Sequence, residues 1–124
     1  MNNLTELIDG YIAMWNEPDA ARRDDLIARI WDENASYVDP VLNGEGHAGI
    51  QTMVQGVQEK FPGHRFNRTS EVDTHHNQLR FTWALGAEGA EPIVKGTDFG
   101  VLAEDGRLQS ITGFFDQLPA PAKS

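Results

Sequence analysis

The chain has no cysteine among its 124 residues. This absence excludes disulfides, thiolate nucleophiles and cysteine-based metal sites. The longest apolar runs are only a few residues, far short of the roughly 20 that a membrane-spanning helix needs. The first residues, MNNLTELIDGY, show no basic region followed by a long apolar one, so no secretory signal is predicted. We therefore expect a cytoplasmic protein that does not interact with membranes.

Positive charge is also scarce, because 10 Lys and Arg stand against 19 Asp and Glu, a net charge of −9. Such a chain would repel nucleic-acid phosphates and polyanionic substrates. There is no phosphate-binding glycine loop, no dinucleotide fingerprint and no serine in a nucleophile elbow. We expect no cofactor and no metal, and a small hydrophobic molecule as the partner that this composition accommodates most easily.

The length fits one domain over residues 1–124, in which 119–124 form a loose tail. Apolar residues recur three and four positions apart in the first half, which predicts three helices. The first is expected over 4–15 and the third over 47–61. The second is expected between them, with Asp19 as its cap and Trp31 on its buried side. Strands are expected over 35–39, 64–73, 78–86, 92–103 and 107–118.

Helices followed by a run of antiparallel strands are typical of an α+β fold. We predict a curved antiparallel sheet that packs on three N-terminal helices and encloses an apolar pocket. Gly96, Gly100 and Gly113 interrupt the strand patterns, where glycine marks bends, bulges or space for a ligand.

Two aspartates occupy unusual strand positions. Asp39 directly precedes Pro40 and shares one face with Tyr37, so a desolvated carboxylate suited to general-base chemistry is one interpretation. The alternative is a solvated residue that forms a turn before the proline. Asp98 lies in the middle of a strand among apolar or tiny neighbours, which favours a carboxyl group kept neutral by an apolar site. An outward-facing aspartate on a half-exposed sheet is the alternative.

Aromatic residues supply the remaining candidates. Tyr11 lies on the apolar face of the first helix, where its hydroxyl either donates into a pocket or reaches solvent from the core. Spacing does not separate core aromatics from pocket aromatics. The residues expected to contact a substrate are Trp15, Tyr37, Met53, Phe61, Trp83 and Phe115.

The order and spacing of four segments resemble the nuclear transport factor 2-like superfamily, in its SnoaL-like and ketosteroid isomerase-like branch. These segments are YIAMWN at 11–16, ASYVDPV at 35–41, HAGI at 47–50 and GTDF at 96–99. The resemblance covers nearly all of residues 4–118 and implies the cone-shaped α+β fold, related to the cystatin-like one. It also implies a homodimer.

The resemblance also implies roles for three residues. In ketosteroid isomerases the general base is an aspartate before a proline at the end of the first strand, which Asp39 matches. A tyrosine on the first helix and a protonated aspartate in a later strand form the oxyanion hole, and Tyr11 and Asp98 match them. Such a carboxylic acid, kept neutral by its apolar surroundings, donates a hydrogen bond in that enzyme, which is an established example of this effect.

Two enzymatic functions and one non-enzymatic function are compatible with these residues. The first is an isomerase that moves a proton at a carbon next to a carbonyl, and the second is a cyclase of the polyketide type that uses the same acid and base. An epoxide hydrolase would need an arginine between the aspartates. Strand alternation places Arg80 on the face opposite Leu79 and Phe81, so an epoxide hydrolase is disfavoured. The non-enzymatic alternative is a small-molecule binding or dimerisation module. The sheet face that carries Lys95, Thr97, Phe99 and Val101 is the expected dimer surface.

Overall fold

The computed structural model describes residues 3–118, with side chains from residue 4 onward, so the expected tail at 119–124 lies outside the described residues. The helices are α1 (Asn3–Asn16), α2 (Ala20–Ile30) and α3 (Gly46–Lys60). The strands are β1 (Trp31–Val38), β2 (Asn43–Glu45), β3 (His64–Arg68), β4 (Asp73–His75), β5 (Gln78–Ala87), β6 (Val94–Leu102) and β7 (Leu108–Gln117). Within residues 3–118 no helix is long and apolar enough to cross a membrane.

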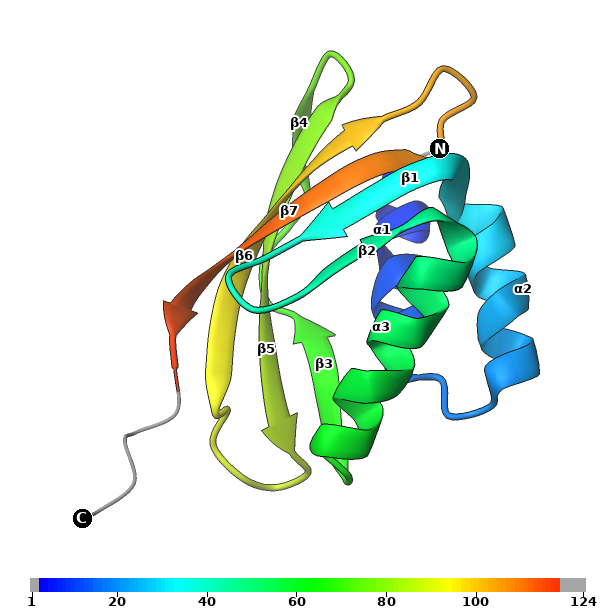
Figure 1. Ribbon diagram of the computed structural model, residues 1–124. Coiled ribbons are helices and arrows are strands. Elements are labelled where there is room, and N and C mark those ends of the chain that lie inside the picture. Colours follow the sequence, from blue (N-terminus) through cyan, green and yellow to red (C-terminus); the bar gives the residue numbers. More distant parts are fainter. Residues whose placement is uncertain (1–2, 119–124) are drawn as a thin grey trace.

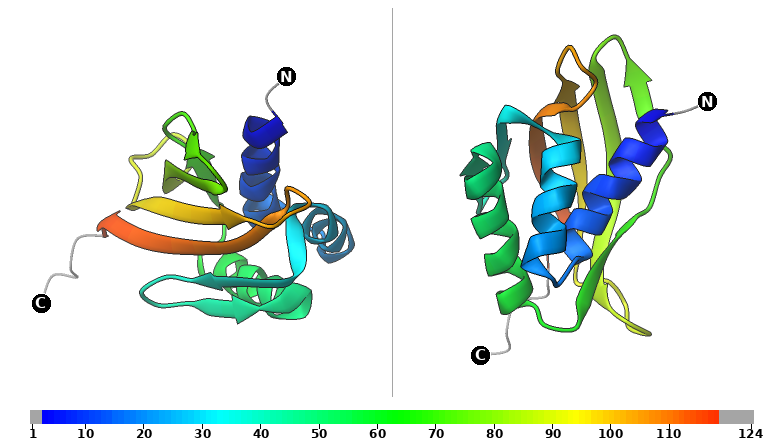
Figure 2. Two further views of the ribbon diagram at one scale, coloured as in Figure 1. Left: turned by 90° about the horizontal axis from the view of Figure 1, so that it is seen from above. Right: turned by 90° about the vertical axis from the view of Figure 1, so that its right-hand side faces the viewer.

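The strands form one strongly curved sheet in the order β2-β1-β7-β6-β5-β3, and β4 pairs with β5. The three helices cover one face of this sheet (Figures 1 and 2). The predicted α+β architecture is therefore confirmed. The sheet is mixed rather than wholly antiparallel, because β1 runs parallel to β7. Sequence patterns predict which residues form strands, but they do not show that the first strand pairs with the last.

Several predicted boundaries were wrong. The first strand begins at Trp31 and not at residue 35, and β2 forms where no strand was predicted. Trp31 does not end a helix but opens β1, because the cap of α2 falls there, with an extended backbone at φ −106° and ψ 140°. Its indole is nevertheless fully buried, and its N–H donates to the Met14 sulfur at 3.2 Å. The predicted strand over 64–73 is two strands, β3 and β4, that pair with different parts of β5. The predicted cap is confirmed, because the Asp19 carboxylate accepts from the Ala21 amide at 2.9 Å.

Arg23 joins the helical layer together. Its guanidinium is fully buried and donates to the Glu17 carbonyl from Nε at 2.9 Å and from Nη2 at 2.8 Å. The other contacts reach side-chain carbonyls on α3, namely Gln51 and Gln55 at 2.7 Å and Gln58 at 3.0 Å. The turn between α1 and α2 is thus fixed to α3, whose last turn approaches the cavity described below.

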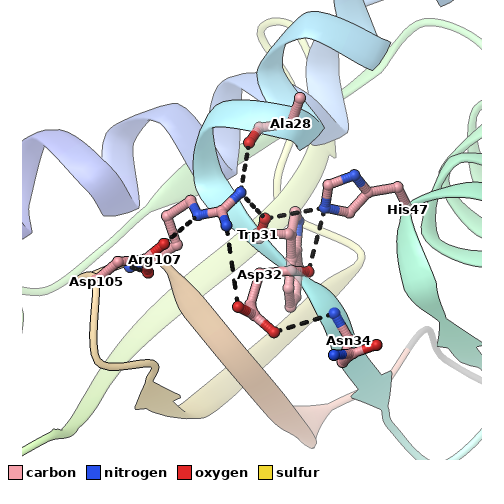
Figure 3. A network of polar contacts seen from close by, with 7 residues as sticks. All are labelled: Ala28, Trp31, Asp32, Asn34, His47, Asp105 and Arg107. Carbon is pink, nitrogen blue, oxygen red and sulfur yellow. Dashed lines mark hydrogen bonds and ion pairs between the residues drawn. The ribbon is translucent and has the colours of Figure 1, made fainter.

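A second polar network fixes the start of β1 (Figure 3). Register is lost between Trp31 and Ser36, where β1 bulges away from β7. The Trp31 carbonyl accepts from Arg107 at 3.0 Å and contacts the His47 ring nitrogen Nε2 at 2.9 Å. Backbone groups that lose their strand partner need others, and these two side chains supply them. Because Arg107 also donates to the Ala28 carbonyl at 3.0 Å, the network joins α2, β1 and the turn before β7.

Candidate functional site

A cavity of about 240 Å³ opens between the curved sheet and the helices. Most of its lining is apolar, and the charged side chains that reach it are Asp39, Asp98 and Lys60. Pockets that bind drug-sized ligands are typically about 300 to 1,000 Å³, so this cavity suits a smaller molecule. The lining residues are Tyr11, Ile12, Trp15, Tyr37, Asp39, Val41, Leu42, Val57, Lys60, Phe61, Phe66, Trp83, Leu85, Val94, Asp98, Phe115 and Leu118.

Aromatic rings form a continuous wall along this cavity. Trp15 contacts Tyr37 at 5.5 Å and Phe66 at 5.2 Å between ring centroids. Phe66 then contacts Trp83 at 5.5 Å, and Trp83 contacts Phe115 at 6.2 Å. Most of these pairs meet edge to face, the arrangement that the quadrupoles of aromatic rings favour. The wall comes from α1, β1, β3, β5 and β7, so it exists only when helix and sheet are packed together.

Asp98 reaches the cavity from the middle of β6 and is 2% exposed. Its Oδ2 accepts from the Tyr11 hydroxyl at 2.8 Å, and its Oδ1 accepts from the Trp83 indole N–H at 2.9 Å. Both donors are neutral, and no cation lies within ion-pair distance among the described residues. The carboxyl group is therefore hydrogen-bonded but not neutralised.

Burial raises the pKa of Asp98 to about 7, since an apolar site disfavours the charged form. The hydrogen bonds from Tyr11 and Trp83 oppose this rise, and the nearby charge of Asp39 adds to it. Burial and the neighbouring Asp98 also raise the pKa of Tyr11 well above its ordinary value. Near neutral pH the Asp98 carboxyl is thus populated in both its protonated and its ionised form, whereas the Tyr11 hydroxyl keeps its proton.

Two glycines make room for this arrangement. A Cβ at Gly96 would stand 2.3 Å from the Trp83 ring, so only glycine lets the indole lie across β6 toward Asp98. A Cβ at Gly113 would stand 3.0 Å from Asp98 Oδ1 and 3.1 Å from both the Tyr37 hydroxyl and Asp39 Cβ. The two aspartates therefore lie around one small space opposite Gly113. At both glycines the space left by the missing Cβ is therefore occupied by side chains of the protein and not by a ligand.

Asp39 follows directly after β1, half-buried at the edge of the cavity. Its Oδ1 accepts from the backbone amides of Val41 and Leu42, both at 2.8 Å. Among the described residues, its Oδ2 accepts from the Tyr37 hydroxyl alone, at 2.7 Å. One oxygen of Asp39 therefore forms the turn of the second interpretation, while the other contacts Tyr37 at the cavity. The role of Asp39 as a general base stays a prediction. Burial, followed by the charges of Asp98 and Asp39, raises the pKa of Tyr37.

The structure brings the three predicted polar residues together, since Tyr11, Asp39 and Asp98 all line the one cavity. Five of the six residues expected to contact a substrate line it as well. Met53 does not, because α3 turns it into the hydrophobic core, where it is 7% exposed. Arg80 lies away from the aspartates, exposed and paired with Asp73 at 3.0 Å, so it supports no epoxide-opening site.

Sequence reasoning missed several contributors. Phe66 and Lys60 both line the cavity, and Phe66 was visible as an apolar residue in a predicted strand. The polar role of Trp83 had no sequence signal, because it depends on the register that sets Trp83 opposite Gly96. The bond between Tyr37 and Asp39 did have one, since residues two apart in a strand share a face. Among residues 3–118 no group of three His, Asp or Glu side chains is placed to hold a metal ion.

Comparison with known proteins places this site in context. The chain is similar to a candidate isomerase of the SnoaL-like family from Agrobacterium tumefaciens, with 40% sequence identity and a TM-score of 0.85. The match covers 90% of this chain and 95% of that one. No family model and no curated protein matches the sequence.

More distant structures share the fold alone. One is a candidate polyketide cyclase from Sinorhizobium meliloti, at 12% identity and a TM-score of 0.69 over 90% of this chain and 95% of that one. Another is a nuclear transport factor 2-like protein of unknown function from Exiguobacterium, at 18% identity and 0.71 over 89% and 98%. The identity and coverage of the Agrobacterium protein go beyond fold likeness, and the chain belongs to the SnoaL-like family.

Proposed function

We propose that this protein is an isomerase that transfers a proton at a carbon next to a carbonyl group of a small hydrophobic substrate. The observation that carries the proposal is the position of Asp98, a buried carboxyl group with a pKa near 7 that contacts Tyr11 beside an apolar cavity. Groups with perturbed pKa values that gather in a pocket are typical of acid–base catalysis. The Agrobacterium relative, itself a candidate isomerase, points in the same direction.

In this mechanism Asp39 is the base. Its Oδ1 is held by two backbone amides, so Oδ2 is the oxygen that takes up the proton. The C–H bond next to the carbonyl breaks, an O–H bond forms on Asp39, and the electron pair moves onto the carbonyl oxygen as an enolate. Return of the same proton to another carbon of the conjugated system completes the isomerisation. Tyr37, which donates to Oδ2, positions this carboxylate.

Tyr11 and Asp98 stabilise the enolate oxygen. When Asp98 is ionised, the Tyr11 hydroxyl is used up in donating to it. A protonated Asp98 can instead donate to the Tyr11 oxygen, and the Tyr11 O–H then turns into the cavity toward the substrate oxygen. Neutral Asp98 thus prepares Tyr11 as a donor in a site with little water, where such a hydrogen bond is worth most. Trp83 only donates, so it holds the other oxygen of Asp98 in place.

Replacement of Asp39 tests the mechanism. Asp39→Asn keeps an oxygen that can accept from the two backbone amides, so the turn is preserved while the base is lost. Conversion of 3-cyclohexenone to the conjugated 2-cyclohexenone, followed by ultraviolet absorbance, should fall by a factor of about 100 or more. Asp116→Asn, on the exposed part of β7, is the matched control and should keep full activity. Equal activity of both variants would reject Asp39 as the base.

Ring closure of a polyketide-like substrate by the same acid and base is the second candidate function. It is supported by the fold shared with the Sinorhizobium polyketide cyclase candidate. The small cavity favours isomerisation, because a larger substrate would have to extend into solvent.

A binding or dimerisation module remains the non-enzymatic alternative. Carbon-detected NMR titration separates it from an enzyme, since an ordinary carboxyl pKa at Asp98 would favour the module. The homodimer stays a prediction, as do the cytoplasmic location and the absence of nucleic-acid and membrane partners. Phe99 and Phe114 on the outer sheet face are 37% and 55% exposed, which supports that face as the dimer surface.

A further inference from the structure

Lys60 is the one positively charged side chain among the residues that line the cavity. It lies in the last turn of α3 and is exposed at the edge of the cavity. Among the described residues no carboxylate stands within ion-pair distance of it, whereas Arg68 and Arg80 each have one and Arg107 has two. Its ammonium group lies 5.9 Å from the centre of the Phe61 ring, which also lines the cavity. On a chain with a net charge of −9, this cation is available to a ligand.

The charges of the cavity are separated along its length. Val94 and Asp98 both line it, and a strand advances about 3.3 Å per residue, so the lining of β6 extends over about 13 Å. The C-terminal turn of α3 and the start of β6 lie at the same end of the molecule in Figure 1 and in the right-hand view of Figure 2. The strand register agrees, because His64, four residues after Lys60, pairs with Ala87, and the nearby Leu85 pairs with Val94. Lys60 therefore lies toward the Val94 end of this lining.

This separation would orient a ligand that carries both a carbonyl and an anionic group. The acidic side chain of Asp39 disfavours an anion at the end of the cavity that it shares with Asp98. The ammonium of Lys60 attracts the anion at the other end. A neutral aromatic or alicyclic ring between the two groups would lie against the aromatic wall.

We infer that the cavity binds an aromatic or alicyclic carbonyl or enol compound that carries a carboxylate at its far end, and that Lys60 recognises this carboxylate. The inference rests on the proposed function, because it places the carbonyl oxygen at Tyr11 and Asp98. Lys60 is here a specificity-determining residue and takes no part in the proton transfer.

Three fluorescent naphthols test this assignment by binding alone. All share one ring system and one hydroxyl group, which imitates the enol at Tyr11. In 6-hydroxy-2-naphthoate the carboxylate is at the far end, in 3-hydroxy-2-naphthoate it is beside the hydroxyl, and 2-naphthol has none. The protein should bind 6-hydroxy-2-naphthoate about fivefold more tightly than 2-naphthol, the upper range for an exposed ion pair, and 3-hydroxy-2-naphthoate most weakly. The preference for the 6-hydroxy compound should shrink as salt is added.

Variants at Lys60 decide the matter. Lys60→Gln should remove the preference for 6-hydroxy-2-naphthoate over 2-naphthol, and Lys60→Arg should keep it. Lys95→Gln, exposed on the outer face of β6, removes the same charge elsewhere and should leave the preference unchanged. If Lys60 only stabilised the C-terminal end of α3, its replacement would change the melting temperature but not the ratio of the affinities for 6-hydroxy-2-naphthoate and 2-naphthol.

A preference that survives Lys60→Gln, or no binding of any of the three naphthols, would overturn the inference. Neither result depends on turnover, so failure of the inference is distinguishable from failure of the proposed base. The latter is tested separately, by Asp39→Asn with 3-cyclohexenone.

Discussion

Two charged side chains are buried among the residues whose side chains the structure describes, Arg23 between the helices and Asp98 beside the cavity. Arg23 donates to four oxygen atoms of the protein, which come from α3 and the turn that precedes α2. Asp98 has two neutral donors and borders an apolar space. Arg23 is thereby part of the scaffold, whereas the carboxyl group of Asp98 borders a space that a ligand can occupy.

The physical difference lies in what replaces the water lost on burial. Several acceptors around a guanidinium compensate for the loss of hydration and leave no group unsatisfied. Two donors to a carboxylate compensate only in part, so the pKa of Asp98 rises to about 7. A buried charge indicates a functional site only when its compensation is incomplete and a cavity adjoins it.

Removal of Arg23 should have the largest effect on stability. Arg23→Met removes all five hydrogen bonds of the guanidinium, which at roughly 0.5 to 1.5 kcal/mol each should cost about 4 kcal/mol of unfolding free energy. Urea denaturation measures the loss. The matched control is Arg22→Met, whose side chain is 75% exposed and should change stability by less than about 1 kcal/mol. Similar losses in both variants would contradict a scaffold role for Arg23.

Asp98→Asn should stabilise the protein, but only at high pH. The pKa of Asp98 is raised in the folded state, so between about pH 4 and pH 7 the unfolded chain releases a proton that the native state retains, and stability falls as pH rises. Asparagine avoids this loss. Relative to the unmodified protein, the variant should gain up to roughly 4 kcal/mol more at pH 8 than at pH 4, at 1.36 kcal/mol per pKa unit.

Urea denaturation at the two pH values measures this gain, with Asp116→Asn as the exposed control. A gain that does not depend on pH would show that the pKa of Asp98 is not raised by folding.

Gly96→Ala should disturb the site at intermediate cost. The added methyl group would displace the Trp83 indole, which stands 2.3 Å from its position, and would break the hydrogen bond to Asp98 Oδ1. We expect a loss of about 1 to 3 kcal/mol in stability and a pKa of Asp98 above 7, measured by urea denaturation and carbon NMR. Gly56→Ala on the open face of α3, where nothing lies within 4 Å, should instead stabilise by about 0.5 to 1 kcal/mol.

The two tyrosines allow the smallest and most selective change, the loss of one hydroxyl group each. Tyr11→Phe removes a donor to Asp98 and should raise the pKa of Asp98 by about one unit. Tyr37→Phe removes a donor to Asp39 and should leave the pKa of Asp98 nearly unchanged. NMR titration of the Asp98 carboxyl carbon compares them. Equal shifts of the Asp98 pKa in the two variants would contradict a specific effect of the Tyr11 hydrogen bond on Asp98.

Much of the site was predictable from sequence, for reasons that are local. The three- and four-residue spacing of apolar residues placed Tyr11 on the buried face of α1, and alternation along β6 placed Asp98 on the inner face. These rules involve only neighbours along the chain. They also identified Asp39 at the end of β1, within one residue of its observed boundary.

The sequence alone therefore determined the three helices, most of the strands, their buried faces and the identity of the acidic residues, because side-chain direction follows from the helical and strand repeats. Only the tertiary structure decided the parallel pairing of β1 with β7, the register that joins Trp83 to Asp98, and the departure of Met53 into the core. It also decided the pKa of Asp98 and the place of Lys60 on the cavity wall. Register, burial and cavity shape arise from contacts between residues far apart in the chain, which no local pattern encodes.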